Sequence, residues 1–533
     1  MKQMLHIFAK DSRQFWPEIL ISLALVAAFV WIYPSSWLLG NTLDVDVGGD
    51  FVKALFEQYL GGILKLLIPV SWWLLIARVI HAEALVGDRQ FWLTRPYEWK
   101  KLLGAKALFL MVFLYLPLLI AQCLLLFTEG FRPLSFIPGL LFNLLLITGI
   151  LVLPLMAIAS VTATFARVTV TLLAGVAGFI AFIAISLLFS NSVSIPSGDH
   201  LAIPLTFCFC GTVVVLQYAA RRVWVSRLLL IALPIVIILS GLAIPESTAI
   251  SRAYPRPSAG QEAPVQLTLL RDTPHPATTY LIRANQVQVS IPLQVSGVAE
   301  GYALIPDTMQ VTVDAANGSH WTSPWQAVYN LHYLPGAGES GVNFLMSRAF
   351  FDQVRSMPVT LHFTLALTQV QAGNVKSIPL STQDFSVPDF GICSPGPSLQ
   401  RQFFGIGCKF ALRQPRLTYI RVRWQDSPCT APQPDSNTVA EGDAWMGTLD
   451  NSPADFGITS VWGAPIGLSN PTNLEGTKAE PRYLCPGVPV TFTQYNFVKR
   501  LQYNFAIPDF HFPNYYPEGR SFGGVDSIGV TVK

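Results

Sequence analysis

The sequence has few charged residues for its length. Asp, Glu, Lys and Arg make up 13% of the 533 residues, whereas soluble domains contain about a quarter. The mean hydropathy is +0.44. The apolar excess lies in residues 1–245, and residues 246–533 have the polar, Pro- and Gly-rich composition of a globular region. The two regions are therefore expected to fold in different solvents.

Motifs for nucleotide binding and for catalysis are also missing. The sequence contains no G-x-x-x-x-G-K-[ST] loop, no dinucleotide-binding glycine pattern, no H-E-x-x-H and no G-x-S-x-G. The net charge is only +3 and the basic residues form no stripe in the tail, so nothing favours a nucleic-acid partner. We expect neither an enzyme nor a bound cofactor or metal. If ATP drives this protein, a separate subunit hydrolyses it.

Long apolar runs fill the first region. About 20 apolar residues in a helix cross a hydrocarbon core of about 30 Å, so the pattern predicts seven transmembrane helices. Basic residues precede the first run, but no small-residue cleavage site follows it, which favours an uncleaved helix over a signal peptide. The predicted spans are residues 18–38, 59–79, 105–127, 135–160, 168–190, 201–220 and 226–245.

The basic residues between these spans predict the orientation. Loops on the cytoplasmic side of a membrane are enriched in Lys and Arg. The other side's loops hold only Lys53 and Arg132. We therefore expect a multi-pass membrane protein with a cytoplasmic N-terminus and an extracytoplasmic tail. The 13 basic residues of the cytoplasmic side are Lys2, Lys10, Arg13, Arg78, Arg89, Arg95, Lys100, Lys101, Lys106, Arg167, Arg221, Arg222 and Arg227.

The tail has the pattern of β-strands. Apolar residues alternate with polar or small ones over 287–295, 309–313, 359–367, 420–424 and 501–507, which is typical of half-buried strands. One short helix is expected at 347–356. Strands without long helices between them favour an antiparallel, sandwich-like fold. The predicted organisation is a transmembrane domain over 1–245, a β-sandwich-like domain over 246–390, and a β- and loop-rich continuation over 391–533.

The cysteines divide between the two regions. Three lie in predicted spans, and four lie in the tail. An even number in an exported domain favours disulfides over free thiols, with three possible connectivities. The absence of a C-x-x-C pair makes a zinc site the weaker interpretation. The disulfide candidates are Cys393, Cys408, Cys429 and Cys485.

The polar segment 83–106 separates the second and third predicted spans. Its aromatic and basic residues suit a lipid headgroup layer, so a plain interfacial connector explains much of its composition. That interpretation does not explain the order of Glu83, Gly87, Thr94, Arg95 and Pro96, which ends in Leu102-Leu103-Gly104-Ala105-Lys106.

This order resembles the loop between the second and third spans of permeases of the type-2 class of ATP-binding-cassette (ABC) exporters. In that family six spans form half of a transport pathway, and the loop docks against a separate ATPase subunit. The resemblance implies an α-helical permease domain, an ATPase partner, and a homodimer or a heterodimer with a second permease. The residues to which it assigns coupling are Glu83, Gly87, Trp92, Arg95, Pro96 and Lys106.

Two functions follow as hypotheses. The first is the permease subunit of an ATP-driven exporter, with membrane lipid around its spans and an added extracytoplasmic domain. The second is a membrane-anchored binding or sensory protein without transport activity, in which the tail is the working part. Seven spans exceed what an anchor needs, which favours the exporter.

Overall fold

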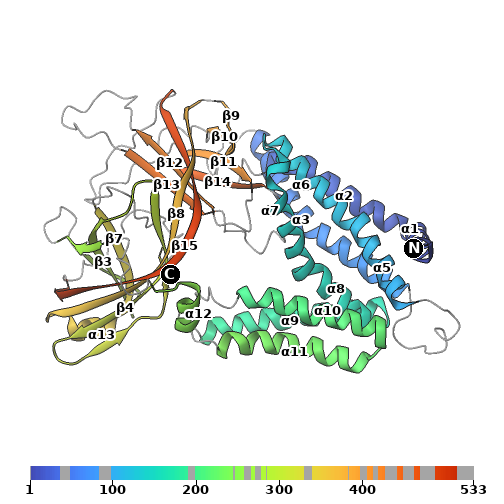
Figure 1. Ribbon diagram of the computed structural model, residues 1–533, viewed down its shortest axis with the longest axis horizontal. Coiled ribbons are helices and arrows are strands. Elements are labelled where there is room, and N and C mark those ends of the chain that lie inside the picture. The colour runs from blue at the N-terminus through green and yellow to red at the C-terminus, as the bar shows by residue number, and fades with distance from the viewer. Residues whose placement is uncertain are drawn as a thin grey trace. The chain divides into compact units, whose positions relative to one another are not determined.

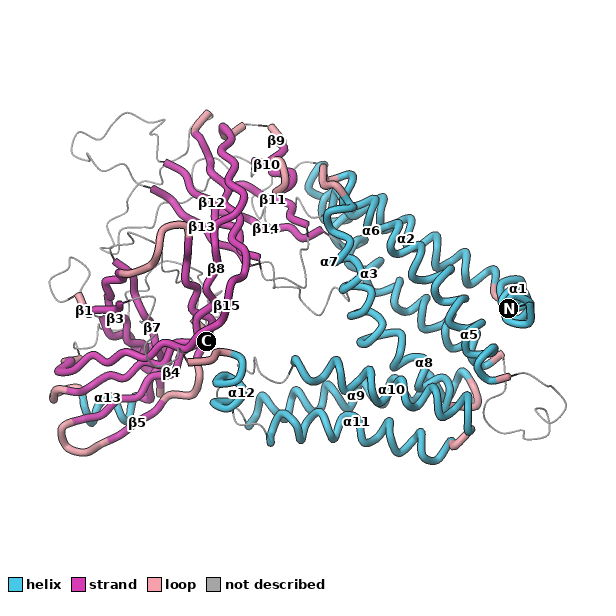
Figure 2. Tube along the Cα trace, viewed as in Figure 1, coloured by secondary structure: helices cyan, strands magenta, loops and turns pink. Residues whose placement is uncertain are grey.

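A computed structural model covers the whole chain (Figures 1 and 2). Among the predicted site residues, Glu83, Gly87, Trp92, Arg95 and Pro96 lie outside the residues it describes, as do the disulfide candidates Cys429 and Cys485. The structure describes residues 2–36, 49–82, 98–189, 199–243, 246–256, 266–270, 278–283, 285–328, 339–381, 383–395, 405–411, 418–425, 441–447, 461–467 and 487–512.

Contacts divide the chain into two compact units. Unit 1 comprises residues 1–244, 381–415 and 448–467, and unit 2 comprises residues 245–380, 416–447 and 468–533. Strands of the tail therefore belong to both units. The predicted separation of 246–390 from 391–533 stays a prediction, because the two units alternate along the tail.

Helices make up the N-terminal part of unit 1. Most are rich in Leu, Ile, Val and Ala, which suits a helix surrounded by hydrocarbon, where every backbone polar group must bond within the helix. The helices are α1 (Lys2–Gln14), α2 (Trp16–Ser36), α3 (Gly49–His81), α5 (Trp99–Leu110), η1 (Met111–Tyr115), α6 (Leu116–Thr128), η2 (Pro133–Phe136), α7 (Ile137–Ile147), η3 (Thr148–Val152), α8 (Leu153–Val161), α9 (Phe165–Phe189), α10 (Asp199–Ala220) and α11 (Val223–Ala243).

Several of these helices have the length of a membrane span. Five described helices are long and apolar enough to cross a bilayer, and α1 with α2, bent by 76°, adds a sixth if the pair is one span. The region predicted as the fifth span contributes the shorter apolar stretch Phe165–Gly178. The helical membrane-type region is confirmed, whereas the number seven stays a prediction. The five are Tyr59–His81, Trp99–Thr128, Pro133–Val161, Ala202–Ala220 and Val223–Ser240.

The remaining described elements are strands, with two short helices in unit 2. These helices are α12 (Glu246–Ala253) and α13 (Arg348–Val354). The strands are β1 (Gln266–Leu269), β2 (Thr278–Arg283), β3 (Gln286–Ser296), β4 (Tyr302–Ala315), β5 (His320–Thr322), β6 (Gln326–Ala327), β7 (Glu339–Ser347), β8 (Val359–Pro379), β9 (Phe385–Val387), β10 (Gly391–Pro395), β11 (Gly405–Ala411), β12 (Thr418–Gln425), β13 (Glu441–Gly447), β14 (Val461–Gly467) and β15 (Pro489–Phe510).

These strands form three antiparallel sheets. Sheet A has the order β1-β3-β2, with β7 also paired to β3. Sheet B has the order β13-β12-β15-β8-β4-β5, with β6 also paired to β4. Sheet C has the order β14-β11-β10-β9 and belongs to unit 1, whereas sheets A and B belong to unit 2. The predicted antiparallel β character is therefore confirmed.

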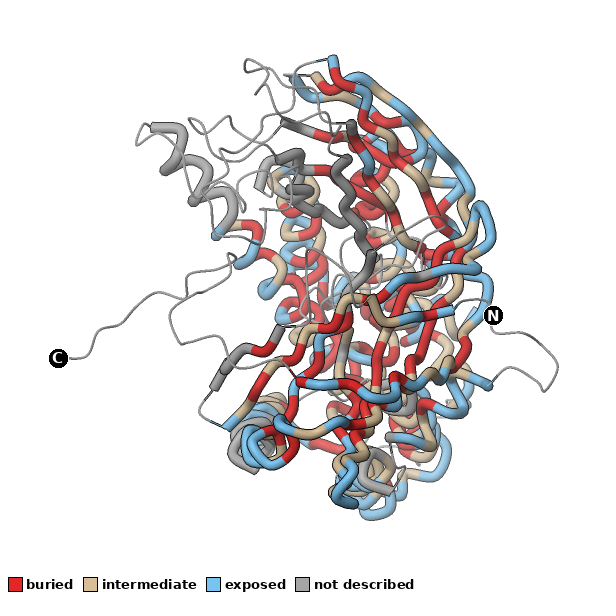
Figure 3. Tube along the Cα trace, turned by 90° about the vertical axis from the view of Figure 1, so that its left-hand side faces the viewer, coloured by how far each residue is buried: buried red, intermediate tan, exposed pale blue. Residues whose placement is uncertain are grey.

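Apolar residues that alternate with polar ones along the strands form the core of unit 2. The residues Val287, Val289, Ile291 and Leu293 of β3 are fully buried, as the alternating pattern predicts. Figure 3 colours the buried residues red along the Cα trace. One hydrophobic core contains side chains of both sheet A and sheet B. The helix predicted at 347–356 is α13, and the Oγ of Ser347 accepts a hydrogen bond from the backbone N–H of Phe350 at its start. A sandwich shape for the whole tail stays a prediction.

Sheet C is cross-linked and packed against the loop that follows α6. Cys393 and Cys408 face each other on β10 and β11 and form a disulfide. This pairing confirms one of the expected bridges. Gly391 of β10 has a φ of +122°, and a Cβ placed there would lie 1.9 Å from the carbonyl oxygen of Lys409 and 2.7 Å from the ring of Phe131. Only glycine allows this close approach.

Replacing Gly391 by Ala should destabilise unit 1, because the backbone conformation and the close contacts both oppose a side chain. We expect a cost of about 1–3 kcal/mol or more, measured as a lower thermal unfolding midpoint of the full chain in detergent. Gly130 is the matched control, since its φ is +78° but its nearest neighbours would be 3.9 Å away. Equal effects of Gly391→Ala and Gly130→Ala would contradict the packing argument.

Candidate functional site

The predicted coupling segment begins after α3 and ends in α5. Residues 83–97 lie outside the described part, whereas the helix ends that flank them are described. The helix α3 ends at His81, and α5 begins at Trp99. The structure thus shows how the two attachment points of the segment are held, and these two helix ends form the candidate site.

On the α5 side, Lys106 lies inside the helix and forms a buried ion pair. Its Nζ donates to Oδ2 of Asp11 at 2.7 Å, and the two side chains are 1% and 0% exposed. Asp11 belongs to α1, which packs beside α5 (Figure 1). The prediction that Lys106 takes part in coupling stays a prediction. The structure shows that its ammonium ties the end of the segment to the N-terminal helix.

This ion pair fixes the position of α1. Removing two charges from water is costly, and only close pairing with good geometry offsets that cost. Any sliding of α1 along α5 would leave both charges unpaired. A small residue helps the approach, since a Cβ on Gly104 would lie 3.2 Å from the sulfur of Met4.

On the α3 side, two contacts hold the helix end. The guanidinium of Arg78 pairs with Glu18 of α2 and lies over the ring of Phe15 at 5.8 Å. The Nε2 of His81 is 3.0 Å from the carbonyl oxygen of Ala159 and 3.3 Å from Oγ1 of Thr162, at the end of α8. The helix is therefore joined to α2 and α8 directly before the undescribed segment.

A further contact brings α11 to the same end of α8. The Nη2 of Arg227 donates to the carbonyl oxygen of Val161 at 3.1 Å. We call the residues joined by these ion pairs and hydrogen bonds the helix-end network. Its members are Asp11, Glu18, Arg78, His81, Lys106, Ala159, Val161, Thr162 and Arg227.

Sequence reasoning found little of this network. No motif in the sequence singles out Asp11, Glu18 or Arg78. In the two ion pairs of the network, the partners are 60 and 95 positions apart in the sequence. No local sequence pattern therefore links them. The available signal was that charged residues stand at the ends of several apolar spans, where each needs either water or a partner.

A second buried ion pair lies at the other end of the Trp99–Thr128 span. The Nζ of Lys409, on β11 of sheet C, donates to Oε1 of Glu129 at 2.7 Å, and the side chains are 10% and 6% exposed. Lys409 directly follows Cys408, whose disulfide braces β10 and β11. The span of 30 residues is about 45 Å long as a helix, so one continuous span connects the network to sheet C.

Unit 2 contains a separate polar cluster around Asp307. This residue lies at an irregularity in the pairing of β4 with β8, between Pro306 and Thr308. Such a β-bulge redirects a side chain. Its carboxylate accepts hydrogen bonds from the hydroxyls of Tyr254, at 3.0 Å, and Thr368.

The cluster attaches the segment after α12 to sheet B. Tyr254 follows α12, and the guanidinium of Arg500 on β15 lies 5.2 Å from its ring centre. Burial raises the pKa of the Asp307 carboxyl, although the hydroxyls of Thr368 and Tyr254 favour its ionised form. Burial, followed by the charge of Asp307, also raises the pKa values of Tyr254 and Tyr419. Both tyrosines therefore stay neutral donors.

Comparisons with known proteins do not assign this site. No family model matches the chain, and no curated protein matches it. A Pseudomonas fluorescens alkylpurine DNA glycosylase bound to DNA aligns at 11% identity and a TM-score of 0.14, over 67% of this chain and 95% of that one. The C-terminal globular domain of a Pyrococcus abyssi oligosaccharyltransferase aligns at 8% identity and a TM-score of 0.10, over 42% and 45%. Likenesses this slight carry no argument.

Removing one partner of the Asp11–Lys106 pair should be strongly destabilising. Lys106→Ala leaves a buried carboxylate without its cation, which costs about 3–5 kcal/mol. The double variant Asp11→Leu with Lys106→Leu should recover most of that loss, because neither charge remains. The measurement is the thermal unfolding midpoint of the full chain in detergent.

Lys101→Ala is the matched control for that series. Lys101 pairs with Glu98 at 2.8 Å on the surface of the same helix, with side chains 39% and 65% exposed, and such pairs contribute at most about 1 kcal/mol. If Lys101→Ala and Lys106→Ala lower the midpoint equally, the buried pair has no special role.

The stability of unit 2 should fall as pH rises from about the ordinary Asp pKa of 3.8 through the raised pKa of Asp307. The folded state holds this proton more tightly than the unfolded state, so the stabilisation is complete below the unfolded pKa and is lost above the folded one. Asp307→Asn should remove this part of the pH dependence, measured by the circular-dichroism melting of the sheets. The control Asp314→Asn changes an exposed carboxylate of the same strand. Identical pH profiles for Asp307→Asn and the parent chain would refute the assignment.

Proposed function

We propose that this chain is the membrane-spanning permease subunit of an ABC exporter and that segment 83–106 docks on a separate ATPase. One observation carries the proposal beyond the sequence resemblance. The helices α3 and α5 flank the segment on either side. Polar contacts hold each of them to other helices within two helical turns of the end that adjoins the segment. A displacement of the segment would therefore move several helices together.

The network gives this coupling a physical route. A push on α5 is transmitted to α1 through the Asp11–Lys106 pair, because separating the two charges in a buried site is costly. A push on α3 reaches α2 through Arg78–Glu18 and α8 through His81. Coupling between distant sites needs such contacts between elements that move as rigid bodies.

The outer end of the same span supplies the second part of the proposal. Lys409 and Glu129 join sheet C to the end of α6, so a movement of the Trp99–Thr128 span reaches strands of the tail. In the proposed orientation the N-terminus and the network are cytoplasmic, and the tail lies outside a bacterial inner membrane. The tail then binds substrate or a periplasmic partner, or caps the pathway, and the subunit works as a dimer.

The docking residues are tested by charge reversal. Arg95→Glu with Trp92→Ala should abolish co-purification with the membrane ATPase and reduce its transport-linked ATP turnover, because an interface loses both a cation and an aromatic anchor. Arg132→Glu is the matched control, since Arg132 immediately precedes η2 near Glu129, at the other end of the span. It should leave ATPase association unchanged.

Two results would overturn the exporter assignment. One is a chain that binds no ATPase under conditions in which the purified protein is folded. The other is an Arg95→Glu, Trp92→Ala variant that transports and hydrolyses ATP like the parent chain.

The alternative is a sensory protein whose tail acts on its helices without transport. The observation that favours it is the same Lys409–Glu129 pair, which would pass a movement of sheet C to α6. This function predicts a ligand-dependent change at α5 in the absence of any ATPase.

A further inference from the structure

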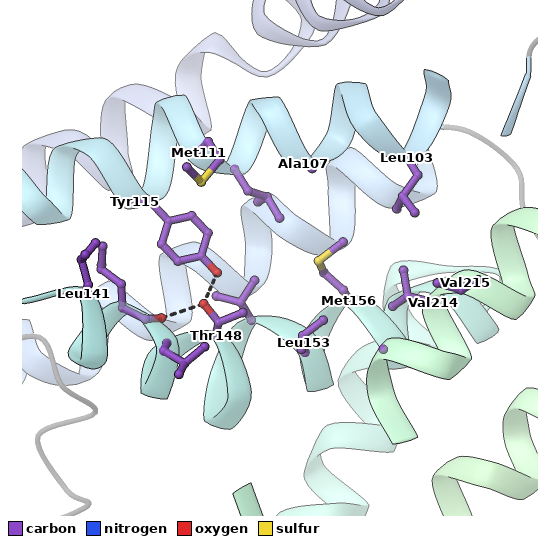
Figure 4. A pocket seen from close by; sticks show the side chains of 15 residues that line it. Leu103, Ala107, Met111, Tyr115, Leu141, Thr148, Leu153, Met156, Val214 and Val215 are labelled. Atoms are coloured by element: carbon purple, nitrogen blue, oxygen red, sulfur yellow. Dashed lines mark hydrogen bonds between the residues drawn. The ribbon is translucent and has the colours of Figure 1, made fainter. Parts of the chain in front are cut away.

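A cavity of about 600 Å³ lies among the helices of unit 1. Figure 4 shows Leu103, Ala107, Met111 and Tyr115 succeeding one another along one wall, opposite Thr148, Leu153 and Met156. The helix α10 contributes Gly211, Val214 and Val215. Ligand pockets typically enclose 300–1,000 Å³, so the size suits one small molecule or one chain.

Two π-helical turns line this cavity. The segment η1 supplies Met111 and Tyr115, and η3 supplies Thr148 and Val152. A π turn inserts an extra residue into a helix and is frequent at functional sites. Gly149 of η3 also packs closely against α10. A Cβ at this position would lie 2.3 Å from the ring of Phe207.

The polar atoms of the cavity are satisfied within the protein. The hydroxyl of Thr148 donates to the carbonyl oxygen of Leu144 at 2.6 Å. It has no second proton, so the hydroxyl of Tyr115, 2.6 Å from Thr148 Oγ1, is the donor in that contact. The other lining side chains are apolar. An occupant therefore meets a hydrocarbon surface with no donor left for it.

Along α5 the lining of the cavity is about as long as one lipid leaflet is thick, and a lysine lies just beyond its Trp99 end. From Leu103 to Tyr115 the helix rises about 18 Å, and half of the hydrocarbon core is about 15 Å. Lys100 precedes Leu103 by three positions, so it lies on the same face of α5. It is exposed, and its Nζ lies 5.7 Å from the ring centre of Trp99. Trp and Lys at a span end mark the headgroup level.

We propose that this cavity binds an acyl chain of an anionic phospholipid from the leaflet at the Trp99 end of α5, with its phosphate beside Lys100. The length of the lining along α5, its hydrocarbon surface and the lysine beyond its Trp99 end match that molecule. The inference goes beyond the proposed coupling, because lipid binding here requires no ATPase.

Filling the cavity tests the proposal. Gly211 lines it, and a Cβ on Gly211 would meet no atom within 4 Å, so Gly211→Leu adds apolar volume to the cavity from a position with room for a Cβ. The full chain is reconstituted in vesicles of phosphatidylglycerol and phosphatidylcholine in equal amounts and then extracted into mild detergent. Mass spectrometry gives the phospholipid retained per chain. Gly211→Leu should lower it several-fold, with a bias toward phosphatidylglycerol in the parent chain.

Two further variants make the test decisive. Gly175→Leu on α9 is the control, because its Cβ also meets nothing within 4 Å and Gly175 does not line the cavity; it should retain lipid like the parent. Lys100→Ala should abolish the preference for phosphatidylglycerol and keep the bound chain. Equal retention by the two Leu variants would overturn the proposal. So would a Gly211→Leu chain that keeps its lipid but loses dimers, since a second copy would then be the occupant.

Discussion

Charges buried in unit 1 must be paired, and this constraint decides which segments of the chain adjoin. Asp11 with Lys106, and Glu129 with Lys409, are the two buried ion pairs at the ends of the Trp99–Thr128 span. Their partners are separated by 95 and 280 positions. In each pair, a buried charge without its partner would carry a desolvation cost of several kcal/mol. The first pair therefore fixes α1 on α5, and the second fixes sheet C on the loop after α6.

The same span also lines the cavity, so the two ion pairs and the cavity all involve the Trp99–Thr128 span. Lys106 lies one residue before Ala107, and Tyr115 lies at the end of the π turn η1. A span whose ends are both fixed can respond to a push by rotating or by changing its π turn, since such a turn has an alternative α-helical register. Either response would change the shape of the cavity between η1 and η3. This arrangement links the proposed coupling and the proposed lipid site physically.

The elements were largely predictable, because their signals are local. Apolar runs of membrane length and period-2 alternation predict the long apolar helices and strands such as β3 and β8, whereas α1 and α12 were not predicted. The candidate site was predictable only in part. The role of Lys106 in coupling stays a prediction, and its buried partner Asp11 and the contacts of Arg78 and His81 depend on residues brought together by packing. The cysteine count favoured disulfides, but pairing Cys393 with Cys408 required the register of β10 on β11.

The sequence by itself determined the apolar character of the N-terminal region, its long apolar helices, the alternating strands of the tail, and the absence of a G-x-x-x-x-G-K-[ST] loop, because composition and periodicity act over neighbouring residues. Only the tertiary structure decided that tail strands join the helical unit, that Lys106 faces α1, and that Gly211 lines a cavity. These features depend on distances between residues far apart in the chain. Hydrocarbon packing and charge pairing set those distances, and the order of residues along any one segment does not record them.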